Sequence, residues 1–267
     1  MHRTHVTTLL VILTMFLTGQ VQAEEKRLTV LRTVVLDPGH GGENLGALGF
    51  NGVYEKKIVM AIALKVSERL ADQTDATAKL TREGDESVPL ARRIAFANEL
   101  QADLFISLHC NSSFSQKPMG VETFVLSEKA LEEESAKLSR QVVTPRGLYA
   151  SAADPAAAAV VKEMLQFAAH RDARGFAEQV QSNLSRSMRA VDRGVKELPI
   201  IILRGAEMPG VVIEVGFISN PVEARNLSKA SYQDLVAQAI VDAIVRYDAT
   251  LSSKRVPGTV AESAIGK

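Results

Sequence analysis

The chain has 267 residues, and 46% of them are hydrophobic, which is enough for one sizeable core. Its 31 Lys and Arg side chains balance 31 Asp and Glu side chains, so no basic field points to a nucleic-acid partner. The single cysteine, Cys110, excludes an intramolecular disulfide.

The first 23 residues predict a secretory signal rather than a part of the fold. A positively charged start at residues 1–3 precedes an apolar run at residues 9–17, and Val21-Gln22-Ala23 has the small-residue pattern of a cleavage site. The apolar run is short for a transmembrane helix, and an uncleaved anchor is the alternative interpretation. We therefore expect export without stable membrane insertion after cleavage, to the periplasm or, as the alternative, by secretion.

After a short segment at residues 24–32, strand-like apolar runs alternate with helical periodicities. The expected strands are 33–36, 79–82, 104–108, 121–126, 200–203 and 211–214. The expected helices are 56–71, 90–100, 128–140, 155–187 with breaks near 172–175, and 232–247. This alternation predicts a single α/β domain at residues 33–250, with a mainly parallel twisted sheet and helices on both faces. The remaining residues, 251–267, predict a disordered tail.

Polar side chains stand where three of the apolar runs end. His40, His109 and Glu214 each follow or terminate such a run. Because ligands bind at the carboxyl ends of the strands in an α/β sheet, we expect these side chains to converge. Two imidazoles and one carboxylate are the ligand set of a catalytic zinc with an open position, and a further carboxylate would be the general base. The third histidine of the mature chain, His170, lies in a charged helical pattern and is expected at the surface.

The carboxylate ligand has two candidates. Glu43 forms an H-x-x-E pair with His40, as in zinc carboxypeptidases, whereas Glu55 follows His40 by fifteen residues. Glu55 also directly precedes a predicted helix, so its charge has a second interpretation as a favourable partner of the helix dipole. Spacing alone leaves the choice between the two glutamates open.

Glu214 lies inside an apolar stretch, where an ionised carboxylate is costly unless it is paired or close to a metal. One interpretation is a buried ion pair with Arg92, Arg93 or Arg204. The other is a general base, because burial should raise the pKa of the Glu214 carboxyl toward the range that suits proton transfer.

The two residues after His109 are expected to differ in role. Side chains alternate between the faces of a strand, so Cys110 should point away from a metal at His109 and remain an inert buried thiol. Asn111 would share the face of His109 if the strand continued. It is a candidate for hydrogen bonding to substrate or to a ligand, or for capping a turn.

Four sequence blocks together resemble a known family. They are the segments 36–42 (LDPGHGG), 55–56 (EK), 107–112 (SLHCNS) and 213–220 (IEVGFISN). In this order they resemble the zinc-dependent type 3 N-acetylmuramoyl-L-alanine amidases, and the resemblance runs from Thr33 to Tyr247. It covers nearly the whole mature chain.

The resemblance implies hydrolysis of the amide between N-acetylmuramic acid and L-alanine in peptidoglycan. It implies one zinc per chain, held by His40, Glu55 and His109, and it thereby favours Glu55 over Glu43. The metal would lower the pKa of a water and polarise the lactyl carbonyl. Glu214 would take the proton of the water and pass it to the leaving amine.

Two other function classes remain as alternatives. A zinc peptidase that uses Glu43 is the first. A wall-binding module without activity is the second. Such a module is expected to lack a zinc ligand or the catalytic glutamate, whereas this sequence has all four residues.

We expect a monomer with peptidoglycan as substrate and an activator protein as a further candidate partner. Residues 128–168 correspond in place to an inhibitory helix of some septal relatives, so they form either a lid or a solvated charged helix.

Overall fold

The computed structural model describes residue 28 and residues 30–142 and 155–255 of the chain. The predicted signal sequence lies outside the described residues. One six-stranded sheet forms the centre, with the strand order β2-β1-β3-β6-β4-β5. The strands are β1 (Thr33–Pro38), β2 (Thr77–Leu80), β3 (Leu104–Asn111), β4 (Val121–Leu126), β5 (Asp192–Leu198) and β6 (Gly210–Phe217).

The sheet is mixed but mostly parallel, as the sequence predicts. Strands β2, β1, β3 and β6 are parallel to one another, and β4 and β5 are parallel to each other. The antiparallel contact is the one between β4 and β6. The carboxyl ends of β1, β3 and β6 therefore meet at one edge of the sheet, where a ligand site is expected.

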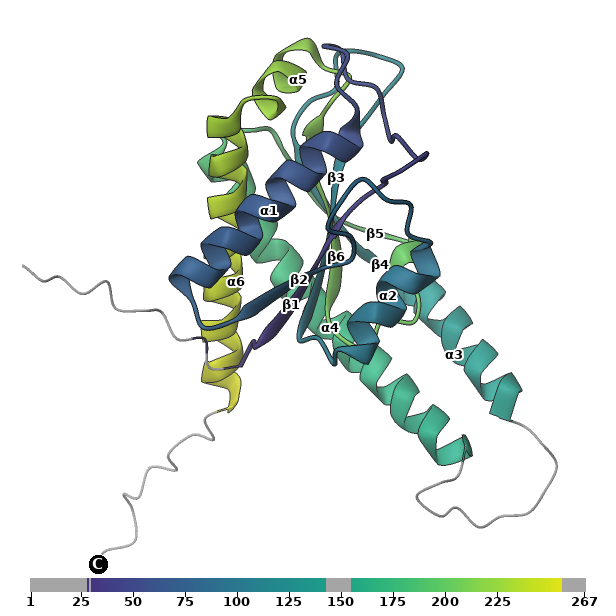
Figure 1. The fold of residues 1–267 in the computed structure, drawn as a ribbon. Coiled ribbons are helices and arrows are strands. Elements are labelled where there is room, and N and C mark those ends of the chain that lie inside the picture. Colours follow the sequence, from purple (N-terminus) through teal and green to yellow (C-terminus); the bar gives the residue numbers. More distant parts are fainter. Residues whose placement is uncertain (1–27, 29, 143–154, 256–267) are drawn as a thin grey trace, which may run out of the picture.

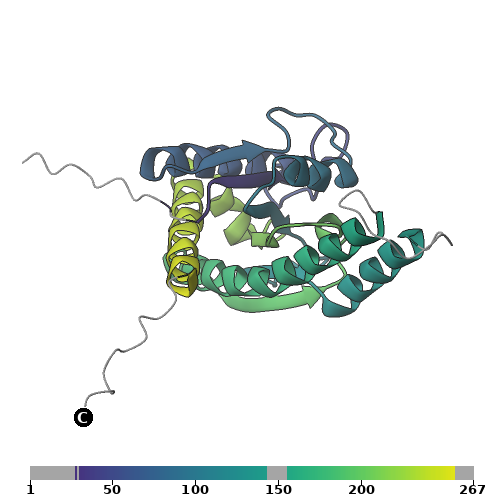
Figure 2. The same ribbon diagram turned by 90° about the horizontal axis from the view of Figure 1, so that it is seen from below.

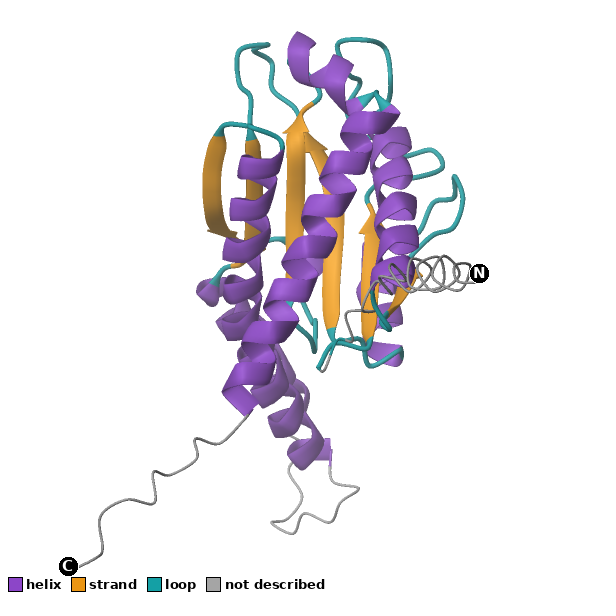
Figure 3. Ribbon diagram, turned by 90° about the vertical axis from the view of Figure 1, so that its left-hand side faces the viewer, coloured by secondary structure: helices purple, strands orange, loops and turns teal. Residues whose placement is uncertain are grey.

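Helices cover the two faces of the sheet unequally. They are α1 (Glu55–Gln73), α2 (Leu90–Glu99), α3 (Glu128–Val142), α4 (Pro155–Ser187), α5 (Pro221–Leu227) and α6 (Ala230–Arg255), with a 3₁₀ turn η1 (Ile201–Leu203). The larger apolar core joins α1, α4 and α6 to one face, and the helices lying across that face are seen in Figure 3. A smaller core joins α2, α3 and η1 to the other face, and Figure 2 shows the layers from below.

Strand β3 shows how this arrangement positions polar groups. Its residues Leu104, Ile106 and Leu108 point into the larger core. Their alternate neighbours, including His109, point to the less covered face. Because one face is buried by long helices, the open face is the one on which a substrate can reach the strand ends.

Several predicted elements differ from the structure. Strand β5 is not predicted, because its sequence DRGVKEL is charged and lies at the sheet edge. The strand expected at 200–203 is the 3₁₀ turn η1, and α4 continues without the break expected near 172–175. Helix α5 is also not predicted, although its N-cap Asn220 accepts hydrogen bonds from two backbone amides and a proline follows. Helix α6 continues to Arg255, beyond the expected start of the tail at residue 251.

Helices α3 and α4 pack together as a hairpin that projects beyond the lower end of the sheet (Figure 1). Glu133 and Glu134 of α3 form ion pairs with Arg204, close to the end of η1. Part of the hypothesised lid, residues 143–154, lies outside the described residues. Among the described residues, every helix is too short or too polar to cross a lipid bilayer.

Candidate metal centre

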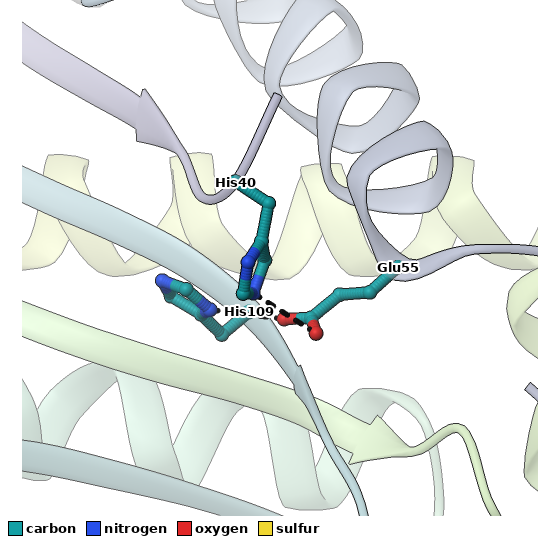
Figure 4. A group of neighbouring side chains, drawn as sticks. All are labelled: His40, Glu55 and His109. Atoms are coloured by element: carbon teal, nitrogen blue, oxygen red, sulfur yellow. Dashed lines mark hydrogen bonds and ion pairs between the residues drawn. The ribbon is translucent and has the colours of Figure 1, made fainter. Parts of the chain in front are cut away.

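Three residues from separate segments converge at the carboxyl edge of the sheet. His40 lies in the loop after β1, Glu55 begins α1, and His109 lies near the end of β3. Their side chains point toward one another (Figure 4), and one ligand atom from each lies within 4.8 Å of the others. The structure therefore brings together His40, His109 and Glu55, whereas Glu43 is exposed.

The Glu55 carboxylate is the centre of this group. Its Oε2 lies 3.0 Å from His40 Nε2, and its Oε1 lies 2.9 Å from His109 Nδ1. Each oxygen also accepts a hydrogen bond from a backbone amide, Oε2 from Ala47 at 2.9 Å and Oε1 from Cys110 at 3.0 Å. Two backbone donors thus fix the orientation of the carboxylate independently of the histidines.

The electrostatic setting keeps Glu55 ionised. Burial by itself would raise the pKa of this carboxyl, but the hydrogen bonds from His109 and His40 and their charges outweigh it and hold the pKa well below its usual range. An ionised carboxylate between two imidazoles is a suitable acceptor for a divalent cation.

His40 is held in an orientation that directs its Nε2 at the Glu55 carboxylate. Its Nδ1 lies 2.9 Å from the Asn44 side-chain oxygen, to which Nδ1–H donates, while Nε2 faces Glu55 Oε2 at 3.0 Å and is the nitrogen that would bind a metal in place of a proton. The backbone of His40 has φ of 61°, an uncommon conformation for a residue with a side chain. A Cβ on neighbouring Gly39 would come within 2.3 Å of the His109 ring, so glycine is needed there for the two histidines to approach.

Two buried arginines hold the backbone of the His40 loop. Arg93 of α2 donates to the carbonyl of His40 at 2.7 Å and to Asp37 Oδ1 at 2.7 Å. Arg82 donates to the carbonyls of Gly39 and Lys56, and so connects the loop to the first turn of α1 next to Glu55. We infer that this arginine pair maintains the strained backbone that positions His40.

Replacing Arg93 with glutamine should weaken metal binding by about 10- to 100-fold, the usual effect of removing a group that orients a ligand. The reason is the loss of the bond to the His40 carbonyl. Chelator competition would measure the affinity. Arg92→Gln is the matched control, because Arg92 lies on the same helix but is exposed and pairs with Glu99. If the Arg93→Gln and wild-type proteins bound the metal with equal affinity and only the melting temperature fell, Arg93 would stabilise the fold without positioning His40.

Glu214 stands beside the three residues on the open face. In the register of β3 and β6 it lies opposite His109, so both side chains share that face. The ion pair considered from the sequence does not form, because each of the three candidate arginines pairs with other carboxylates. These pairs are Arg92 with Glu99, Arg93 with Asp37, and Arg204 with Glu133 and Glu134. Among the described residues, no group hydrogen-bonds to Glu214 Oε2, which is buried.

The surroundings of Glu214 change its acidity. Burial raises the pKa of the carboxyl to about 7, and the negative charges of Glu55 and Glu122 act in the same direction, while His109 opposes them. A carboxyl that titrates near neutral pH and has a free oxygen is suited to accept and return a proton.

Three other expectations have clear outcomes. Cys110 is a buried free thiol that points into the larger core, away from the three residues, as predicted. Strand β3 does continue to Asn111, whose side-chain amide donates to Glu122, a partner that the sequence does not indicate. His170, expected at the surface, is instead partly buried, since it lines a small cavity with Gln166 between α4 and the sheet.

The group of His40, Glu55 and His109 can hold a metal ion. Two imidazole nitrogens and one carboxylate oxygen are the donor set of catalytic zinc sites with an open position. The support around them fits that use, because Asn44, two backbone amides and Arg93 fix the donors before any ion binds.

Comparisons with known proteins agree with this geometry. The N-acetylmuramoyl-L-alanine amidase AmiA of Escherichia coli K12 is 30% identical over 233 residues, 86% of this chain and 80% of that protein. The crystal structure of an N-acetylmuramoyl-L-alanine amidase from Clostridium difficile 630 superposes with a TM-score of 0.64 at 27% identity, covering 85% of this chain and 100% of that one. The CwlD amidase of Clostridioides difficile, solved in complex with the GerS lipoprotein, superposes with a TM-score of 0.64 at 26% identity. The superposition covers 82% of this chain and 99% of that one. Residues 34–246 match the family model for N-acetylmuramoyl-L-alanine amidases, and the chain therefore belongs to this family.

Proposed function

We propose that this protein is a zinc-dependent hydrolase that cleaves the amide bond between N-acetylmuramic acid and L-alanine in peptidoglycan. The observation that carries the proposal is the convergence of His40, Glu55 and His109 next to Glu214, whose buried Oε2 has no hydrogen-bond partner in the described part of the chain. Membership of the amidase family supports the bond and the substrate.

His40, Glu55 and His109 would hold one zinc per chain. Bound zinc would supply a Lewis acid that polarises the scissile carbonyl and makes a water more acidic. The protein contributes a fixed arrangement of donors on the open face, with the side chains of His40 and His109 21% and 24% exposed, so that a substrate amide can approach.

Glu214 is the proposed general base and acid. Its free Oε2 accepts a proton from the attacking water as the C–O bond forms, and then delivers the proton to the amide nitrogen as the C–N bond breaks. The products are the lactyl carboxylate of the muramic acid and the free amino group of L-alanine. Burial raises the pKa of the Glu214 carboxyl in the metal-free protein, and this favours uptake of the proton from water.

The cellular setting is part of the proposal. Residues 1–23 direct export, and the substrate requires a periplasmic or secreted location. An activator protein is a candidate partner, since the structural relative CwlD is described in complex with the GerS lipoprotein.

Purified peptidoglycan provides the direct test. Mature protein, residues 24–267, should release peptides with free L-alanine amino termini when zinc is present, and EDTA should stop this release until zinc is restored. Mass spectrometry of the released peptides and end-group analysis would identify the bond. Products with cleaved peptide bonds, or with cleaved glycosidic bonds and an intact lactyl amide, would contradict the proposal.

A further inference from the structure

A row of charged side chains crosses the open face of the sheet beside the candidate metal centre. His109 of β3 lies opposite Glu214 of β6, and Glu214 lies opposite Glu122 of β4. The next strand, β5, contributes Arg193 and Lys196, which both pair with Glu122. The proposed mechanism uses the first two members of this row and leaves the other three without a role.

Glu122 organises the two cations. It is 4% exposed, and its Oε2 accepts from Arg193 Nε at 3.0 Å and from the Lys196 ammonium. Its Oε1 accepts from the side-chain amide of Asn111. Both carboxylate oxygens are therefore bonded within the protein, and this one negative charge faces two positive charges.

Both cations keep part of their surface free. The side chains of Arg193 and Lys196 are 34% and 42% exposed. Each also lies over an aromatic ring, with Arg193 at 4.9 Å from the ring centre of Phe217 and Lys196 at 5.8 Å from that of Phe124. Glu122, Arg193 and Lys196 by themselves thus carry one net positive charge in an ordered arrangement, on the two strands that follow Glu214 in the sheet.

We propose that Arg193 and Lys196 form a subsite that binds a carboxylate of the peptide on the leaving-group side of the scissile amide. The inference rests on the proposed function and deepens it. Neighbouring strands are about 4.8 Å apart, and an extended peptide advances about 3.3 Å per residue. Strand β5 is two strands from β6, but both cations reach back to Glu122 on β4, one strand from Glu214. A peptide that leaves Glu214 toward β5 therefore brings the carboxyl group of its second residue close to the cation pair.

The opposite side of His109 has a different chemistry. There a hollow of about 510 Å³ lies between the His40 loop, α2 and the η1 region, with Leu90 and Ile201 among its exposed apolar walls. Among the described residues that line it, the one Lys or Arg side chain is Arg93, which is buried and bonded to Asp37 and to backbone carbonyls. An anionic peptide consequently finds accessible positive charge on the β5 side, and the hollow is left for the less charged part of the substrate.

Two soluble substrates test the subsite on the zinc-loaded mature protein. They are N-acetylmuramoyl-L-alanyl-D-glutamate and the same compound with both glutamate carboxyls amidated. We expect wild type to prefer the acidic substrate in kcat/KM by about tenfold, the effect of one charge-assisted hydrogen bond. Arg193→Gln/Lys196→Gln should reduce this preference to within about twofold, mainly through a higher KM for the acidic substrate.

Control variants keep the test specific. Arg174→Gln should retain the preference, because Arg174 is a cation paired with a β5 residue, Glu197, but belongs to α4. Glu122→Gln added to the double variant avoids leaving a buried carboxylate unpaired, and it should show the same loss of preference. Equal kcat/KM values for the two substrates in wild type would overturn the subsite. A wild-type preference for the acidic substrate in both the double variant and the triple variant with Glu122→Gln would also overturn it.

Failure of the proposed function gives a different result. If wild type hydrolysed neither substrate, the amidase proposal would be contradicted, and calorimetry with the same two compounds would then decide the subsite separately. Tighter binding of the acidic compound that is lost in the double variant would support it. Equal binding of both compounds to wild type would contradict it.

Discussion

Glu214→Gln is expected to lower kcat for peptidoglycan hydrolysis by about 10²- to 10⁴-fold, the usual contribution of a general base. The glutamine has the shape of the glutamate but cannot accept and return the proton. Bound zinc, measured by atomic absorption, should stay at the wild-type level, because His40, Glu55 and His109 are unchanged. Glu197→Gln on β5 is a control, since that carboxylate is partly exposed and pairs with Arg174.

The same substitution should change the pH dependence of stability. The pKa of Glu214 is raised from 4.5 to about 7 by burial, so the native state favours the neutral form. The contribution of neutral Glu214 to the free energy of unfolding is fully present below pH 4.5 and is lost as the pH rises through 7. The loss amounts to about 3 kcal/mol. In metal-free protein, Glu214→Gln should therefore melt above wild type at about pH 8 and close to it at about pH 4.5.

Two results would contradict this account of Glu214. Wild-type activity of Glu214→Gln at normal zinc content would assign the proton transfer to another group. An identical difference in melting temperature between variant and wild type at both pH values would show that the carboxyl titrates with an ordinary pKa. The first result concerns catalysis and the second concerns burial, so the two measurements are independent.

Glu55→Ala is expected to weaken zinc binding by more than about 100-fold, beyond the effect of removing an orienting group, and to abolish activity at low zinc concentration. Glu55 contacts both histidines and is 4% exposed. Loss of its carboxylate also leaves the backbone amides of Ala47 and Cys110 without their acceptor, at a cost of about 1–3 kcal/mol each. Circular dichroism would confirm that the variant is folded before zinc is measured.

Glu43→Ala is the matched control for the ligand. Glu43 stands in the H-x-x-E position relative to His40 but is exposed. Its replacement should leave zinc affinity and activity within about twofold of wild type, as is usual for a surface substitution. Zinc loss in Glu43→Ala together with normal zinc binding in Glu55→Ala would show that Glu43 is the ligand. This result would favour the zinc peptidase interpretation.

Local sequence patterns predict the parts of the fold that bury most apolar surface. Strand β4 has the predicted bounds, and β1, β3 and β6 extend the predicted runs by a few residues. The long amphipathic helices are predicted for the same reason, because their apolar faces repeat at helical spacing. Strand β5 cannot be predicted in this way, since an edge strand with charged side chains has little apolar pattern.

The apolar runs of the sequence are sufficient to place His40 and His109 near strand ends, whereas Glu214 lies inside β6, which continues to Phe217. These runs do not specify which groups meet at the site. The choice of Glu55 over Glu43 depends on where the start of α1 lies against β3. Whether Glu214 is unpaired depends on arginines that are bonded elsewhere. These contacts join segments far apart in the chain, and their geometry is set by packing of the whole sheet, which no local pattern encodes.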